Sequence, residues 1–180
     1  MGVFRLVSSR PLLAITAVLV LSSPALAAVP PPKAGIDTYA QLPTPLPYPY
    51  DEALSAKATN AAVARARARA LKAHKLLMID LGGNWCGDCR VLSGALELPE
   101  MKAFVDRHYE VVDVDVGRFD KNLQVPGAYG IHHRLEGVPA LLIVDPKTNR
   151  LLDKGRESAL QDARSMTPQA LADWLAQWPK

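Results

Sequence analysis

Hydrophobic residues along the chain form short blocks that predict the strands of a sheet. The apolar runs at 76–81 and 140–144 are continuous, which is typical of buried strands. Residues 109–116 alternate and are rich in valine, so they predict a third strand. Turn-forming residues at 145–149 separate the second run from residues 150–154, which we expect to pair back as a hairpin.

Helices are predicted around these strands. Residues 51–75 are rich in alanine and poor in helix breakers, and Asp51 or an adjacent residue is expected to cap their start. A second helix is predicted over 86–97, and a short third one over 99–107, where proline opens the segment. Residues 119–131 give a weaker helical pattern that a Pro-Gly pair interrupts.

The last helix has the clearest signals. Thr167 is the predicted N-cap and Pro168 the first helical residue. Four apolar side chains follow at helical spacing on one face: Leu171, Trp174, Leu175 and Trp178. The order of all these elements predicts an α/β domain over residues 51–180, with a central mixed sheet flanked by helices and an N-terminal helical extension.

The first 27 residues have the pattern of an export signal. Arg5 and Arg10 precede the apolar stretch 12–21, and Ala25-Leu26-Ala27 offers a small-residue cleavage site. We therefore expect a cleaved signal peptide over 1–27 and a periplasmic location; an uncleaved signal that anchors the chain in the inner membrane is the alternative. Cleavage lowers the formal charge from +3 to +1, so nothing in the charge suggests nucleic-acid binding.

A proline-rich segment connects the signal to the domain. Residues 28–50 hold seven of the fifteen prolines, which favour extended backbone over helix or central strand. The segment is either a linker or a strap that lies over the domain, and Tyr39, Tyr48 and Tyr50 favour the strap. A polyproline ligand for a partner protein is a further alternative.

The only two cysteines of the chain lie between a predicted strand and a predicted helix, as Cys86-Gly87-Asp88-Cys89. Two thiols at this spacing can close into a disulfide and reopen by thiolate exchange. The preceding strand favours redox chemistry over half of a zinc site. Unpaired amides at the helix start favour the thiolate of Cys86, whereas burial raises the pKa of Cys89 one turn further in.

Residues 79–90, with Trp85 before the first cysteine, resemble the active-site segment of the thioredoxin superfamily. A second similarity follows at 129–131 and 137–144, where Gly-Val-Pro precedes an apolar strand. The resemblance covers roughly residues 51–178 and implies the thioredoxin-like fold. It also implies a cis peptide bond between Val138 and Pro139, packed against the dithiol.

The resemblance implies roles for individual residues. Cys86 is the attacking thiol, Cys89 the resolving thiol, and Asp80 on the strand beneath them transfers a proton to or from Cys89. A carboxyl buried in a strand has a raised pKa, which suits this work; an ordinary strand-end aspartate is the alternative. The implied substrate-binding residues are Trp85, Gly87, Asp88, Val138 and Pro139.

Two departures from thioredoxin itself bear on the expected chemistry. Asp88 takes the place of a proline, and its carboxylate opposes ionisation of Cys86, with Arg90 and solvent offsetting part of the effect. Less thiolate stabilisation makes the pair a weaker oxidant, so we expect a reductase rather than an oxidase. A lysine near the buried acid is not evident in residues 111–115.

The insertion 132–136 is expected to approach the rim of the active site, where its two histidines either affect substrate preference or form a solvated loop.

The sequence therefore predicts an exported thiol–disulfide oxidoreductase. Its substrates are protein disulfides, its electron donor a membrane-bound thiol protein, and its redox group the Cys86–Cys89 disulfide, without a further cofactor or a metal. A soft-metal (copper) binding protein or metallochaperone is the first alternative, because thiolates are soft ligands. A thioredoxin-like assembly factor without turnover is the second.

Overall fold

The computed structural model describes residues 1–2 and 29–179, so the predicted signal peptide lies outside the described residues apart from its first two. Within that part of the chain, no helix is both long and apolar enough to cross a membrane. The elements follow in this order: η1 (Tyr39–Gln41), α1 (Ala56–Ala73), β1 (Leu76–Gly82), α2 (Gly87–Leu96), α3 (Pro99–His108), β2 (Tyr109–Asp115), α4 (Gln124–Gly127), β3 (Ala140–Asp145), β4 (Arg150–Leu151), η2 (Ala163–Ser165) and α5 (Pro168–Leu175).

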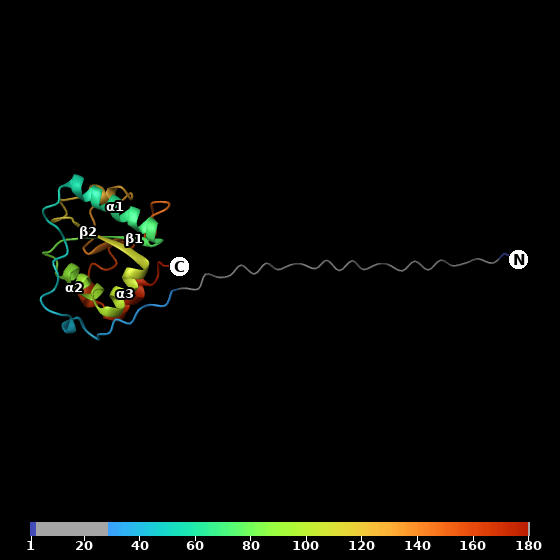
Figure 1. Cartoon of the computed structure of the whole chain (residues 1–180), viewed down its shortest axis with the longest axis horizontal. Coiled ribbons are helices and arrows are strands. Elements are labelled where there is room, and N and C mark those ends of the chain that lie inside the picture. The colour runs from blue at the N-terminus through green and yellow to red at the C-terminus, as the bar shows by residue number, and fades with distance from the viewer. Residues whose placement is uncertain (3–28, 180) are drawn as a thin grey trace.

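The four strands form one mixed sheet in the order β2-β1-β3-β4. The central strand β1 pairs in parallel with β2 and antiparallel with β3, and β4 closes the antiparallel hairpin with β3. Helix α1 covers one face of the sheet, and α2, α3 and α5 cover the other (Figure 1). The predicted α/β fold with a mixed sheet and flanking helices is confirmed.

Side chains of β1 alternate between the two layers because successive residues of a strand point to opposite faces. Ile79 and Leu81 pack in the core on the α1 side, and Met78 packs in the core under α2, α3 and α5. All three are fully buried. Asp80 lies between Ile79 and Leu81, so the same alternation places its carboxyl on the side of Met78.

Three predicted elements differ at their ends. Helix α1 starts at Ala56, because Ser55 rather than Asp51 caps it by accepting a hydrogen bond from the Ala58 N–H (3.3 Å). The predicted helix over 119–131 shrinks to α4. Strand β4 is only two residues long, because the carboxylate of Asp153 takes the place of a strand neighbour and accepts a hydrogen bond from the Ile143 N–H (2.9 Å).

Residues 29–50, called the strap below, lie along the domain. The strap passes the helices that cover the lower face in Figure 1 and then turns beside α2 toward α1. Four of its residues are buried: Pro32, Ala34, Leu42 and Tyr50. Near its start, Gln169 of α5 accepts from the Ala34 N–H (3.1 Å) and donates to the Pro32 carbonyl (3.1 Å).

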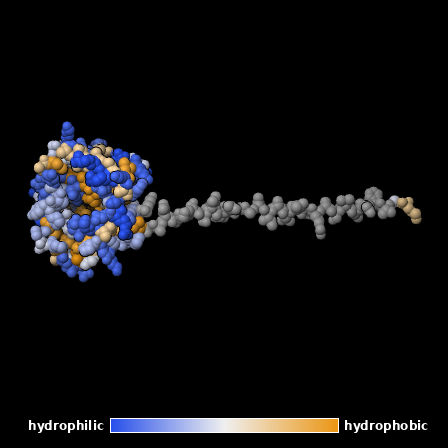
Figure 2. Space-filling model, viewed as in Figure 1, coloured by the Kyte–Doolittle hydropathy of each residue, from blue (hydrophilic) through white to orange (hydrophobic). Residues whose placement is uncertain are grey.

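The surface on the viewed side is mostly hydrophilic, with small separate apolar patches (Figure 2).

Candidate functional site

The two cysteines lie where β1 ends and α2 begins, and a disulfide joins them. Cys86 is the N-cap of α2, and its Sγ accepts a hydrogen bond from the Cys89 N–H (3.1 Å). A side chain at this position receives the unpaired amides of the first helical turn. The same interactions favour a negative charge on the Cys86 sulfur once the disulfide is reduced.

The loop before β3 lies against this pair. Val138 and Pro139 are joined by a cis peptide bond, as the resemblance implies, and the Val138 carbonyl oxygen lies 3.3 Å from Cys86 Sγ. Cys86 is 5% exposed, whereas Cys89 is fully buried. An incoming group therefore reaches Cys86 and not Cys89, which supports the predicted order of attack.

Asp80 lies beneath the pair and is 1% exposed. Burial and the neighbouring Asp113 raise the pKa of its carboxyl well above the usual value, and a hydrogen bond from Tyr50 acts against this shift. Asp113 is the register partner of Asp80 on β2, and burial raises its own pKa to about 6. Where thioredoxin often has a lysine near the buried acid, this chain thus has a second acid and a tyrosine.

Tyr50 is a residue of the site that the sequence pattern does not single out. Its hydroxyl donates a hydrogen bond to Asp80 Oδ1 (3.0 Å), and the side chain is 3% exposed. Its backbone is held by Asn84, which accepts from the Tyr50 N–H (3.2 Å) and donates to the Tyr50 carbonyl (2.8 Å). Three tyrosines among prolines were the available signal, but nothing in their spacing distinguishes Tyr50 from Tyr39 or Tyr48.

Asp88 has a different partner from the one expected. Arg90 points to the strap, where it donates to the carbonyls of Leu46 (2.8 Å) and Pro47 (3.0 Å). Arg164 forms the ion pair with Asp88 instead (2.9 Å), and its backbone N–H donates to the same carboxylate (2.9 Å). Asp88 is buried, so its charge is compensated locally. The expectation that Arg90 offsets the charge of Asp88 is therefore wrong, because Arg164 forms the ion pair with Asp88.

The guanidinium group of Arg164 also lies at the dithiol loop. A β-carbon placed on Gly87 would be 3.2 Å from a terminal nitrogen of Arg164, so the cation packs on the residue that follows Cys86. The pairing joins residues 76 positions apart. Gly87 has no β-carbon, so the guanidinium of Arg164 has room to pack against it. The sequence alone does not reveal this requirement.

Trp85 forms the exposed side of the site and is 42% exposed. Its indole N–H donates to the Gly117 carbonyl (2.8 Å), and the guanidinium of Arg118 lies 4.1 Å from the centre of its ring. Phe119 meets the same indole edge-on, and Arg134 lies over Phe119. The insertion 132–136 thus reaches the rim through Arg134, while its two histidines are exposed.

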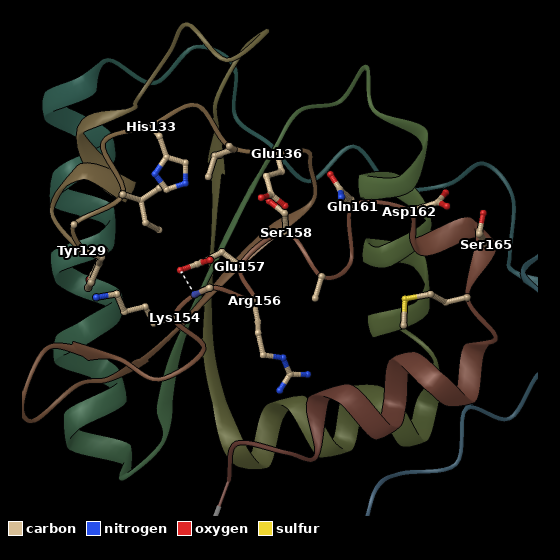
Figure 3. A pocket seen from close by; sticks show the side chains of 16 residues that line it. Tyr129, His133, Glu136, Lys154, Arg156, Glu157, Ser158, Gln161, Asp162 and Ser165 are labelled. Carbon is tan, nitrogen blue, oxygen red and sulfur yellow. Dashed lines mark hydrogen bonds between the residues drawn. The ribbon is translucent and has the colours of Figure 1, made fainter.

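One sizeable cavity lies apart from the dithiol. It measures about 580 Å³ and is enclosed by the loops 129–136 and 154–166 (Figure 3). Lys154, Arg156, Glu136 and Glu157 are among its lining residues, and none of the predicted site residues lines it. Over the described range, no group of three or more His, Cys, Asp or Glu side chains is placed to hold a metal ion.

Comparison with known proteins agrees with this geometry. A family profile described as thioredoxin-like matches residues 57–146, half of the chain. A crystal structure described as a disulphide isomerase from Xylella fastidiosa Temecula1 superposes with a TM-score of 0.64 at 35% identity, over 73% of this chain and 96% of that one. Thioredoxin-2 of Pyricularia oryzae is 45% identical over 47 residues, which cover 26% of each protein. The chain belongs to the thioredoxin-like family and carries the Cys-x-x-Cys redox site of a thiol–disulfide oxidoreductase.

Proposed function

We propose that this protein is an exported thiol–disulfide oxidoreductase that reduces disulfides of protein substrates through Cys86 and Cys89. The observation that carries the proposal is the position of Cys86. Its sulfur caps α2, accepts the Cys89 N–H, and lies beside the Val138 carbonyl. The carbonyl of Val138 and the exposed face of Trp85 flank this sulfur and offer a place for the substrate backbone.

In the proposed reaction, the Cys86 thiolate attacks one sulfur of the substrate disulfide. A mixed disulfide forms, and the other substrate sulfur leaves as a thiolate. Cys89 then gives its proton to Asp80 and attacks Cys86 Sγ, so that the Cys86–Cys89 bond forms and the second substrate sulfur leaves with its electron pair. The dithiol loses two electrons, and the substrate gains them with two protons.

The charges around the pair support a reducing direction. Asp80, Asp113 and Asp88 all lie in or next to the site, and carboxylates oppose the formation of a nearby thiolate. Arg164 compensates Asp88, whereas the side-chain hydrogen bond to Asp80 comes from a neutral tyrosine. A less stabilised thiolate favours the disulfide form of the protein, which makes its dithiol an electron donor.

Export and an electron supply complete the proposal. The basic, apolar and small-residue pattern of residues 1–27 supports secretion to the periplasm, with retention of the signal as a membrane anchor as the alternative. A periplasmic reductase has to be reduced again after each turnover. A membrane protein that carries a thiol pair is the partner that this chemistry requires.

The test is the equilibrium reduction potential of the Cys86–Cys89 pair, titrated against a thiol buffer. A value near that of thioredoxin, about −270 mV, supports an electron donor, and one near about −120 mV would instead indicate a disulfide donor. Cys86→Ser and Cys89→Ser serve as matched variants. The second variant should accumulate a mixed disulfide with substrate, whereas the first should not react; equal activity of both with the wild type would point to an assembly factor without turnover.

A further inference from the structure

We infer that Tyr50 of the strap is a positioning residue of the redox site, whose hydroxyl holds Asp80 in the orientation in which the carboxylate serves the buried thiol of Cys89. The inference rests on the proposed function and extends it to a segment outside the thioredoxin-like match, which begins at residue 57. The strap is then part of the active site.

The first support is the placement of the hydroxyl group. It donates to Asp80 Oδ1 at 3.0 Å inside the protein, where a hydrogen bond to a charged acceptor is strong. Gly82 locates the same hydroxyl relative to the dithiol. A β-carbon on Gly82 would collide with the Tyr50 hydroxyl on one side and would lie 2.9 Å from Cys89 Sγ on the other. The Tyr50 hydroxyl and Cys89 Sγ therefore both lie next to Gly82 of β1.

The second support is the way the strap is attached. Two residues that flank the Trp-Cys-Gly-Asp-Cys segment hold it: Asn84 makes two hydrogen bonds with the Tyr50 backbone, and Arg90 makes two with carbonyls at 46 and 47. Arg90 also stacks on the Tyr48 ring, 3.8 Å from its centre. The active-site segment itself thus fixes the backbone that delivers the Tyr50 side chain, which is the arrangement expected of a positioning residue.

The third support is a cavity of about 440 Å³ that reaches Asp80. Asp80 and Asp113 line it from the sheet, Pro47 and Pro49 from the strap, and charged groups of α2 and α3 complete it: Glu97, Lys102 and Asp106. Lys102 pairs with Asp106 (3.4 Å). The strap therefore forms a wall of the space through which the buried carboxyl can exchange its proton with solvent.

The groups that face Asp80 define what Tyr50 does. Burial and then Asp113 on β2 raise the pKa of Asp80, and the hydrogen bond from Tyr50 provides the opposing interaction. Tyr50 itself stays neutral, because burial and Asp80 raise the pKa of its phenol far above the usual value. Without the hydroxyl, Asp80 would keep its proton to higher pH and would be a poorer acceptor for the Cys89 proton at neutral pH.

The experiment compares Tyr50→Phe with Tyr48→Phe in the mature protein, with Ellman's reagent as the probe disulfide. The first released chromophore reports attack by Cys86, and the second reports attack by Cys89. We expect Tyr50→Phe to slow the second release about tenfold at pH 7, the low end for loss of one hydrogen bond to a charged group. The pH midpoint of the second release should also move upward, whereas the rate of the first release should stay unchanged. Tyr48→Phe should leave both releases unchanged, because the Tyr48 ring is exposed and its stacking on Arg90 needs no hydroxyl.

A double variant separates positioning from a general structural role. If Tyr50 acts through Asp80, Tyr50→Phe adds no further slowing to Asp80→Asn, and this result supports the inference even if Tyr50→Phe lowers stability. Multiplicative slowing in the double variant would overturn it, as would a wild-type second release in Tyr50→Phe. Failure of the proposed function looks different, because the wild-type protein would then show both releases but a reduction potential near about −120 mV.

Discussion

Asp80 and Asp113 are direct neighbours across the parallel β1–β2 pair, so two acids share one level of a buried sheet. The charge on Asp113 raises the pKa of Asp80, which ties the basicity of one carboxyl to the ionisation of the other. Two acids that interact in this way titrate as a pair. The pH profile of the resolving step should therefore respond to both residues.

Asp113→Asn should move the pH midpoint of that step downward. The substitution removes the neighbouring negative charge, so Asp80 loses its proton at lower pH. The rate of the second chromophore release from pH 5 to pH 9 measures the shift. Asp106→Asn is the matched control, because Asp106 lines the same cavity but is largely exposed and pairs with Lys102. An upward shift in Asp113→Asn, or equal shifts in both variants, would contradict the assignment.

Asp80→Asn should slow the attack of Cys89 on the mixed disulfide by about 10²-fold, the lower range for loss of a general acid or base. The first step should keep its rate, since Cys86 ionises through the amides of α2. Rapid-mixing experiments with acid quench would detect the mixed disulfide as it accumulates. Equal rates in variant and wild type would mean that Asp80 has only a structural role.

Arg164→Gln should make the dithiol more reducing. Loss of the guanidinium leaves Asp88 buried without its ion pair, and the carboxylate then opposes ionisation of Cys86. We expect a raised pKa of Cys86 and a reduction potential lower by roughly 30 mV, which corresponds to a tenfold change in equilibrium constant. Thiolate absorbance and titration against a thiol buffer measure the two quantities. Adding Asp88→Asn to the variant should reverse most of the shift; a shift that persists would assign it to something other than this pair.

Asp153 should make the protein less stable as the pH rises from about 4 to about 7. Burial raises the pKa of its carboxyl to about 7 in the folded protein, against 3.8 as the ordinary value. The folded state thus binds the proton more tightly, and this stabilisation is complete below pH 4 and is lost as the pH rises through 7.

Asp153→Asn keeps the oxygen that accepts the Ile143 N–H and removes the titration. The free energy of unfolding of the variant should therefore fall less steeply across this window, by up to about 1.4 kcal/mol per pH unit. Urea denaturation of the oxidised protein at pH 4.5, 6 and 7.5 gives the slopes. Asp37→Asn on the exposed part of the strap is the control, and identical slopes for Asp153→Asn and wild type would be inconsistent with this account.

The elements at the core of the site could be predicted from sequence because their signals are local. The apolar run that forms β1, the cysteine at the start of α2 and the Thr167-Pro168 start of α5 each depend on a few consecutive residues. Strand β4 and the segment around α4 were predicted too long. Side-chain contacts made only in the folded chain lie at both places: Asp153 accepts from the Ile143 N–H after β4, and Asn122 donates to the Asp115 carbonyl before α4.

The groups that tune the site could not be predicted from sequence, because each comes from a distant segment. Tyr50 meets Asp80 across 30 positions, and Arg164 meets Asp88 across 76. Neither pair has a periodicity or a motif, and each depends on how the strap or the loop before α5 docks on α2. Arg90, which is adjacent in sequence to the dithiol, was the plausible but wrong choice for Asp88, because the strap carbonyls compete for its guanidinium.

The strap also covers the dithiol on the side of its buried acid. Tyr50 and the strap backbone held by Asn84 and Arg90 lie on the side of Asp80 and Cys89, whereas the Val138 carbonyl and Trp85 flank Cys86. Under the proposed function, a substrate disulfide has to approach Cys86 from a side that the strap does not cover.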